Sequence, residues 1–221
     1  MNYIIRNTTV SPQLSAEWNS PAWVCAETTE VSSFRPESSV HRPQTLVRLL
    51  HDNDGLHGIF KVRDQFVRCI RTNYFDEVWK DSCVELFLEP KEGRGYFNFE
   101  FNCGGAHLCC YITDPERAPG GFKEFIKLPA EIGQTIQVRS SLPKTVEPEI
   151  KEPLEWTLQF FIPFAVMEQF VGDIGEKNGQ LWRGNFFKCA EELSHPHWAS
   201  WSPVDEFNFH LPRCFGSIQF D

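Results

Sequence analysis

Hydrophobic and polar residues alternate with a period of two along several stretches of the chain, and this alternation is typical of half-buried β-strands. In the clearest stretch, residues 96–102, Phe97, Phe99 and Phe101 occupy every second position. Further strands are predicted within residues 45–64, 83–89, 108–112, 135–142, 155–162, 182–190 and 217–220. The pattern predicts a total of about nine or ten strands.

Turn-forming residues divide these stretches and leave room for little helix. The sequence Asp52-Asn53-Asp54-Gly55 predicts a tight turn, so residues 45–64 should form a hairpin. Pro163 ends a strand and predicts one short helix at residues 164–171, because proline is tolerated in a first helical turn. Residues 143–153 contain three prolines, which indicates a loop. We therefore predict an all-β fold, an antiparallel β-sandwich of the immunoglobulin-like or jelly-roll-like kind.

Residues 1–44 differ from the rest of the chain because they are polar and rich in Ser, Thr and Pro, with Trp18 and Trp23 embedded among them. We interpret this segment as a lead-in with a strand or two that packs on a single domain spanning residues 1–221. A chain of this length suits one large β domain and can bury a sizeable core.

Charge and composition exclude several classes of partner. The net charge is −9 and no run of Lys or Arg is present, so we expect no nucleic-acid partner. No stretch of about 18 apolar residues occurs, so we expect no membrane partner. The eight cysteines form no CxxC motif and no secretory signal is visible, so we expect reduced thiols and a cytoplasmic location.

The same alternation predicts a polar sheet face. If the three phenylalanines of residues 96–102 point into the core, then Asn98, Glu100 and Asn102 share the opposite face. Glu85 and Asn185 lie opposite the apolar stripes of their own strands, as do Thr157 and Gln159. Amides and carboxylates in this mixture match the donors and acceptors of sugar hydroxyls. The alternative is an ordinary solvated sheet face.

Several ordered segments resemble carbohydrate-binding module family 9. Val78–Leu88 is similar to a strand of that family in which a tryptophan precedes "DSVE" and a hydrophobic-Phe pair, and Tyr96–Asn102 is similar to the strand that follows it. Three later segments also match the family pattern: Glu155–Phe164, Leu181–Asn185 and Trp198–Ile218. The resemblance extends over residues 23–220.

This resemblance implies a β-sandwich that clamps a mono- or oligosaccharide between two aromatic rings without catalysis, in association with xylan- or cellulose-type polysaccharide catabolism. The matching rings are Trp79 and Phe209, where the second ring of the family is usually Trp. Glu85 and Asn102 match polar sugar contacts, and Glu100 stands where a basic residue is expected. The predicted ligand-binding residues are Trp79, Glu85, Asn98, Glu100, Asn102, Asn185 and Phe209.

The resemblance also implies that a structural calcium ion can be present, although no cofactor is required. Calcium prefers several oxygen ligands. Asp52, Asn53, Asp54, Asp64 and Asp81 are the candidates. For the first three, a plain hairpin turn is the competing interpretation.

Other functions fit the same residues. Glu85 and Glu100 on neighbouring strands are a possible carboxylate pair for a glycoside hydrolase. His195 and His197, with Cys189 or His210, are a possible metal site. The third alternative is a protein-interaction sandwich that has lost sugar binding, with Trp198 and Trp201 as anchors.

Overall fold

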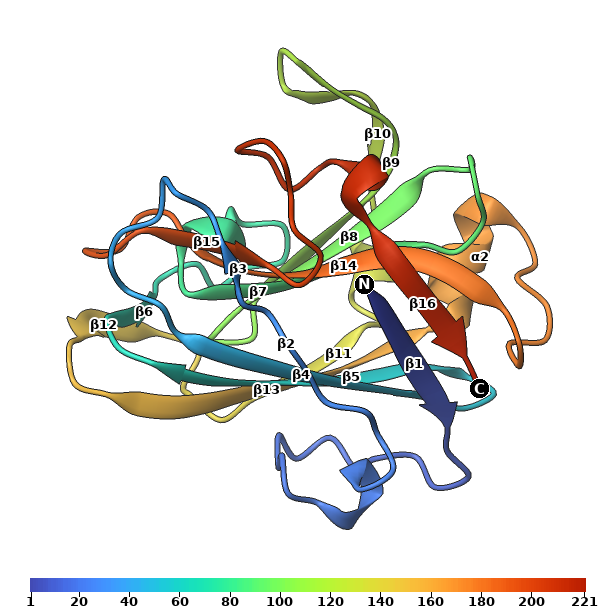
Figure 1. Cartoon of the computed structure of the whole chain (residues 1–221), viewed down its shortest axis with the longest axis horizontal. Helices are drawn as coiled ribbons and strands as arrows, with labels where there is room; N and C mark the ends of the chain where they lie inside the picture. Colours follow the sequence, from blue (N-terminus) through green and yellow to red (C-terminus); the bar gives the residue numbers. More distant parts are fainter.

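The computed structural model of the protein describes residues 1–221 and consists mostly of β-strands arranged in two layers (Figure 1). The first sheet has the strand order β10-β9-β8-β7-β14-β16-β1, and β15 and β3 extend it beside β14. Its strands are β1 (Asn2–Asn7), β3 (Ser33–Phe34), β7 (Cys83–Glu89), β8 (Tyr96–Asn102), β9 (His107–Ala118), β10 (Gly121–Lys127), β14 (Leu181–Ala190), β15 (His197–Ser200) and β16 (Gly216–Phe220). The predicted all-β sandwich is confirmed.

The second sheet continues from β1 in the order β1-β4-β5-β13-β11, with β2 paired to β4. Its further strands are β2 (Thr29–Glu30), β4 (Gln44–His51), β5 (Gly55–Asp64), β11 (Gln137–Ser140) and β13 (Leu154–Pro163). Two short strands, β6 (Val67–Cys69) and β12 (Val146–Ile150), form a separate ribbon. The helices are α1 (Ala130–Gly133) and α2 (Phe164–Val171), with 3-10 turns η1 (Pro21–Trp23), η2 (Val78–Lys80) and η3 (Pro212–Cys214). Neither α-helix has the length and apolar character to cross a bilayer.

Strand β1 joins the two sheets. Its first four residues, Asn2–Ile5, pair with β16 of the first sheet, and its last two residues pair with β4 of the second sheet. Both pairings are parallel, so the sandwich departs at β1 from the antiparallel arrangement that was predicted. Two parallel neighbouring strands must be joined by a long connection. The connections of β1 satisfy this requirement because β4 and β16 lie far along the chain.

The core between the sheets is one cluster of 37 buried residues. The predicted stripe of Phe97, Phe99 and Phe101 faces inward and belongs to this cluster. The ring of Phe101 stacks on Phe160 of the second sheet, with 5.0 Å between centroids and an angle of 5°. Alternation in the sequence therefore identified correctly which side of these strands is apolar.

Two local predictions are confirmed, one is wrong and one short helix was not predicted. The hairpin of β4 and β5 and helix α2 occur where they were predicted. Residues 143–153 are not a plain loop, because β12 lies among them; its Pro148 is tolerated since only Val146 and Ile150 pair with β6. A second helix, α1, is only four residues long, too short to produce a helical period in the sequence.

The N-terminal lead-in covers the outer face of the second sheet, where it lies beneath β4 and β5 in Figure 1. Trp18 and Trp23 form a small apolar cluster with Leu50 and Ile59 of that sheet. The amide of Gln159 accepts hydrogen bonds from the backbone N–H groups of residues 15 and 16 and donates one to the carbonyl of residue 13. The outer face of the second sheet therefore binds the lead-in through both apolar packing and hydrogen bonds.

A buried ion pair links the two sheets. Lys188 of β14 lies 3.7 Å from Asp64 of β5, and both side chains are almost fully buried. Asp64 also accepts hydrogen bonds from His41 and from the indole of Trp156. Burial alone would raise the pKa of Asp64, but the charge of Lys188 and the hydrogen bond from His41 hold it well below its ordinary value. The carboxylate therefore stays charged and needs its cation.

Replacing Asp64 by Asn should lower the free energy of unfolding by about 3–5 kcal/mol, because Lys188 would keep a buried charge without its partner. Urea denaturation followed by tryptophan fluorescence measures the change. The control is Lys123→Met, which removes an exposed charge paired with Asp114 and Glu116 and should leave the midpoint unchanged. Equal effects of the two substitutions would contradict a structural role for the buried pair.

Candidate functional site

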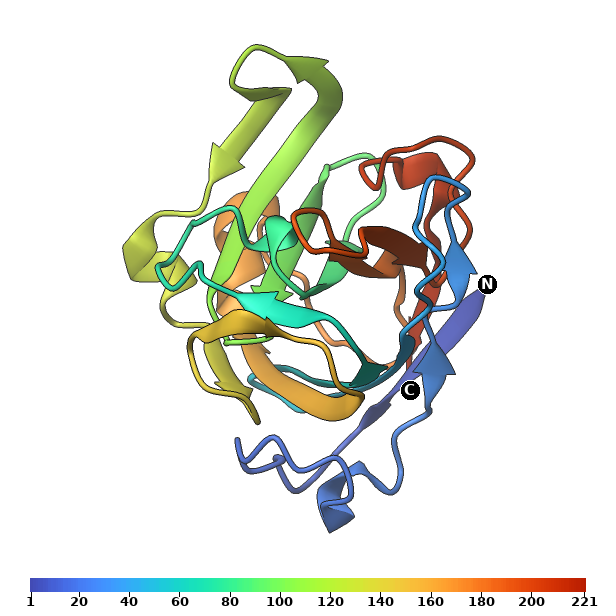
Figure 2. The same cartoon turned by 90° about the vertical axis from the view of Figure 1, so that its left-hand side faces the viewer.

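A cavity of about 590 Å³ lies on the outer face of the first sheet, away from the core. Its floor is formed by side chains of β7, β8, β9 and β14: Glu85, Asn98, Glu100, Leu108, Cys110 and Cys189. Its walls come from residues 75–79, from the β9–β10 hairpin and from residues 198–210. Figure 2 shows this hairpin projecting from the body of the sandwich.

Strand register brings the polar floor residues together. Glu85 of β7 is directly opposite Glu100 of β8, and Asn98 of β8 is opposite Cys110 of β9. Directly opposite residues of an antiparallel pair have Cβ atoms about 4.5–5.5 Å apart. The predicted residues Glu85, Asn98 and Glu100 therefore share one small area, as the alternation of their strands indicated.

Glu100 is buried and only half of its carboxylate has a partner. Its Oε1 accepts a hydrogen bond of 2.7 Å from Nδ2 of Asn98, while its Oε2 is buried without any partner in the protein. Asn98 is itself fixed, because its Oδ1 accepts a 2.7 Å hydrogen bond from the backbone N–H of Cys110. Leaving a buried carboxylate oxygen unpaired costs free energy, so this atom is ready to accept a hydrogen bond from a ligand.

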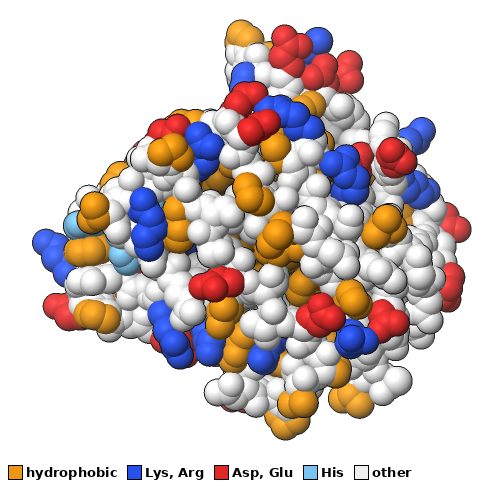
Figure 3. All heavy atoms as spheres, in the orientation of Figure 1, with side chains coloured by type: hydrophobic (Ala, Val, Ile, Leu, Met, Phe, Trp, Pro, Cys, Tyr) orange, Lys and Arg blue, Asp and Glu red, His pale blue; other side chains and the backbone are white.

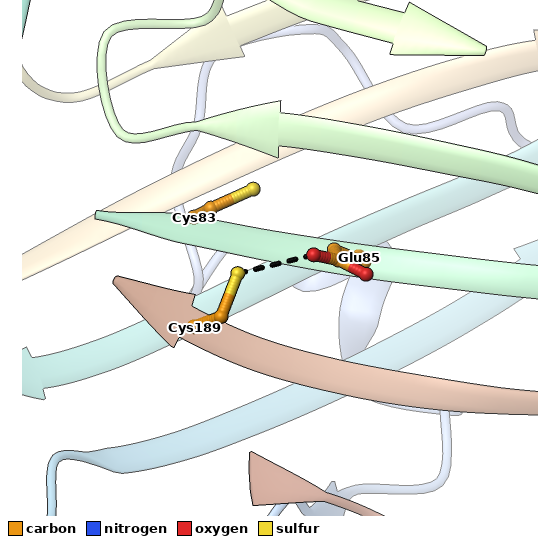
Figure 4. A group of neighbouring side chains, drawn as sticks. All are labelled: Cys83, Glu85 and Cys189. Carbon is orange, nitrogen blue, oxygen red and sulfur yellow. Dashed lines mark hydrogen bonds between the residues drawn. The ribbon is translucent and has the colours of Figure 1, made fainter. Parts of the chain in front are cut away.

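Glu85 lies beside two thiols. Cys189 of β14 donates a hydrogen bond of 3.1 Å to Oε1 of Glu85, and Cys83 precedes Glu85 on the same strand (Figure 4). One ligand atom from each of the three residues lies within 4.8 Å of the others. Thiolates and carboxylates are ligands that zinc accepts, so this group can hold a small divalent cation once the thiols lose their protons. Burial raises the pKa of both thiols, which keeps them protonated when no metal is bound.

Burial shifts both floor carboxyl groups toward the neutral form. Desolvation raises the pKa of Glu85 well above its ordinary value, and the nearby Cys189 and Glu100 add to the shift. Desolvation raises the pKa of Glu100 to about 7, against the hydrogen bond from Asn98. The pair can therefore exchange a proton with a ligand near neutral pH.

Aromatic side chains surround the polar floor. Trp79 and Phe209, the predicted clamp residues, both line the cavity and are half-buried. One face of Phe209 stacks on Phe187, with 4.2 Å between ring centroids. The remaining aromatic residues of the lining are Phe75, Phe122, Phe125, Trp198 and Phe207.

Two predicted site residues lie outside the cavity lining. The amide of Asn102 donates to the carbonyl of Arg71 and to Asp81, and its oxygen accepts from two backbone N–H groups of the β8–β9 turn. The amide of Asn185 bonds to the backbone of Ser202 in both directions. Both amides are fully buried and use their donors and acceptors to hold loops in place.

The alternative metal site is not assembled. His197 accepts a 2.8 Å hydrogen bond from the buried Lys188, whereas His210 bonds to the hydroxyl of Tyr96 on the outer face. Cys189 is engaged with Glu85. The residues that the sequence suggested as metal ligands therefore lie apart, because His197 is in the interior whereas Cys189 and His210 line the cavity.

The calcium candidates lie at three separate places. Asp52 accepts hydrogen bonds from its own hairpin turn and from His57, which matches the plain-turn interpretation. Asp64 belongs to the buried ion pair, and Asp81 is paired with Arg71 at 2.9 Å. The structure does not bring these oxygens together into one ligand set, and bound calcium stays a prediction.

Sequence reasoning missed most of the cavity walls. Phe122 and Phe125 lie on β10, whose pairing with β9 shifts register between residues 122 and 125, so their spacing departs from a period of two. Phe207 and Phe209 do alternate, and this short pattern was a usable signal. On the face drawn in Figure 3, acidic and basic side chains are interspersed, so surface charge alone does not mark a binding site there.

A sequence model of carbohydrate-binding family 9 matches residues 24–220. A search of the curated proteins found no match. Among solved structures, a provisionally assigned carbohydrate-binding protein from Bacteroides uniformis is similar with a TM-score of 0.86 and 27% sequence identity, over 100% of this chain and 99% of the other.

Two structures of family 9 carbohydrate-binding modules from Caldicellulosiruptor kristjanssonii are also similar. The module in complex with glucose has a TM-score of 0.66 at 13% identity, over 100% of this chain and 96% of the other. The module in complex with cellotriose has a TM-score of 0.62 at 13% identity, over 100% of this chain and 93% of the other. At this identity the likeness establishes a shared fold.

The raised pKa of Glu100 has a consequence for stability. Its ordinary value is 4.5 and its folded value is about 7, so the folded protein binds this proton more tightly than the unfolded chain. The resulting stability is present below pH 4.5 and is lost as the pH rises through about 7. Glu100→Gln, which stays neutral, should therefore be more stable than the parent by about 3 kcal/mol near pH 8.

Urea midpoints of parent and variant at about pH 5 and about pH 8 measure this difference. The control is Glu155→Gln on the second sheet, where the carboxylate is half-exposed and its loss should change the urea midpoint only slightly. If the urea midpoints of Glu100→Gln and the parent differed by the same amount at both pH values, the raised pKa of Glu100 would be contradicted.

Proposed function

Because the chain belongs to carbohydrate-binding family 9, a family of binding modules and not of enzymes, we propose that its cavity binds a short saccharide. The observation that carries the proposal is the combination of an aromatic lining with a buried polar floor in a single cavity of about 590 Å³. Apolar walls with a few fixed polar groups are the usual composition of a small-molecule site.

The proposed clamp consists of Trp79 and Phe209, which accept the C–H face of a sugar ring by stacking. Below them, Glu85 and Glu100 accept hydrogen bonds from sugar hydroxyls, and Asn98 holds Glu100 in position. Asn102 and Asn185 have no part in this contact, because their amides hold loops. Stacking and a few hydrogen bonds, offset by desolvation, should give an affinity on the order of micromolar to millimolar.

Family 9 consists of binding modules, so we propose that Glu85 and Glu100, which are neighbours on adjacent strands of one floor, bind saccharide and do not hydrolyse it. We therefore propose a module that holds saccharide for polysaccharide catabolism of the xylan or cellulose type, with glucose and cellotriose as the first probes because related modules bind them.

Replacing Trp79 by Ala should weaken saccharide binding by at least about tenfold while shifting the melting temperature by no more than a few degrees, because the ring is half-buried and lines the cavity. Isothermal titration with glucose and cellotriose, together with thermal unfolding, measures both effects. The control is Leu181→Ala, an exposed apolar residue outside the lining, which should leave binding unchanged. Unfolding of Trp79→Ala, or full binding by it, would remove Trp79 from the site.

A further inference from the structure

The floor carboxylates are exceptional among the buried acids of the protein. Asp64, Asp81 and Glu89 are buried, and each lies within 4.0 Å of a cationic side chain, namely Lys188, Arg71 and Arg183. Glu85 and Glu100 are at least as well buried as Glu89, yet no ion pair of the protein includes either of them. A buried carboxylate without a cation is costly, and its carboxyl group shifts toward the neutral form, so a positive charge on a ligand would stabilise the ionised form of this pair.

The free oxygen of Glu100 supports this interpretation. Glu100 is 4% exposed, its Oε1 is held by Asn98, and its Oε2 has no hydrogen-bond partner. An ionised carboxylate accepts hydrogen bonds and cannot donate them. When Glu100 is ionised, the partner that its Oε2 lacks is therefore a donor, and a charged donor satisfies both the hydrogen bond and the charge.

The lining favours a cation over an anion. Four lining residues are acidic (Glu77, Glu85, Glu100 and Glu191) and two are basic (Arg117 and Lys127). The two basic groups are already placed over aromatic rings, Arg117 at 4.4 Å from the centroid of Phe122 and Lys127 at 4.8 Å from that of Phe75. Aromatic faces attract cations, so the ring-lined walls also suit a ligand with a positive charge.

We infer that the saccharide taken by this cavity carries a free, protonated amine, and that its ammonium group binds at the Glu85–Glu100 pair. This inference rests on the proposed function and specifies its ligand as an amino sugar. A neutral sugar supplies hydroxyl donors to Oε2 of Glu100 but leaves the charge of the pair unbalanced. A uronic acid would add a further negative charge beside the two carboxylates.

The inference gives binding a characteristic pH dependence. The titratable or charged groups that line the cavity together with Glu100 are Glu77, Glu85, Cys110, Arg117, Lys127, Cys189, Glu191 and His210. Burial and Glu191 raise the pKa of Glu100, and Asn98 and Arg117 lower it, with a result of about 7. Affinity for an ammonium ligand should therefore rise as the pH approaches 7 and Glu100 ionises, and fall again when the amine loses its proton.

The test compares glucosamine, glucose and N-acetylglucosamine by isothermal titration at about pH 6.5, where the free amine is protonated. Glucosamine should bind at least about tenfold more tightly than the two uncharged sugars, because a charged hydrogen-bonding partner is added. Titrations in two buffers of different ionisation enthalpy should show proton release when glucosamine binds and none when glucose binds.

Two variants test whether Glu100 causes the preference for glucosamine over glucose. Glu100→Gln should bind glucosamine and glucose about equally, whereas Glu155→Gln on the second sheet should keep the full preference for glucosamine. The ligand series on the parent protein remains decisive if Glu100→Gln does not fold.

The outcomes separate this inference from the proposed function. If glucose binds as tightly as glucosamine and Trp79→Ala abolishes both, the site binds saccharide and the inference is overturned. Retention of the preference in Glu100→Gln also overturns it. If no saccharide binds to the parent, the proposed function fails and the inference fails with it.

Discussion

The structure depends on a sheet that is buried on both faces. Every residue of β7 and β8 is buried, although only one face of these strands meets the second sheet. The inner face carries the phenylalanines of the main core, whereas the outer face is covered by loops and by the β9–β10 hairpin. A polar side chain on the outer face must therefore find partners among these covering segments, because water does not reach it freely.

This constraint explains why similar polar side chains on the outer sheet faces have different partners. Asn102 and Asn185 lie where a loop backbone crosses the sheet, so they bond to that backbone. Gln159, on the outer face of the other sheet, is used in the same way by the N-terminal lead-in. Glu85 and Glu100 lie where the covering segments separate and leave a cavity above them. The identity of the covering segment, and not the polarity of the strand position, decides which polar residues face a ligand.

The sequence was sufficient for the parts of the molecule that depend on local pattern. Alternation predicted the inward stripe of Phe97, Phe99 and Phe101, and it placed Glu85, Asn98 and Glu100 on one common face. It could not distinguish Asn98 from Asn102, because the partners of Asn102 include Arg71 and Asp81, which approach from a distant segment. It also missed β12, whose proline is acceptable only because the strand is paired sparsely with β6.

Strand β1 has a consequence for how the protein folds. It lies between β16 and β4, and its pairing with β16 joins residues such as Asn2 and Ser217, which are 215 positions apart in sequence. Such a pairing has one of the largest loop-closure entropies that a chain of this length can have. Proteins dominated by distant contacts fold slowly. The union of the two sheets at β1 and β16 should therefore be a late event in folding, after the local hairpins of each sheet have formed.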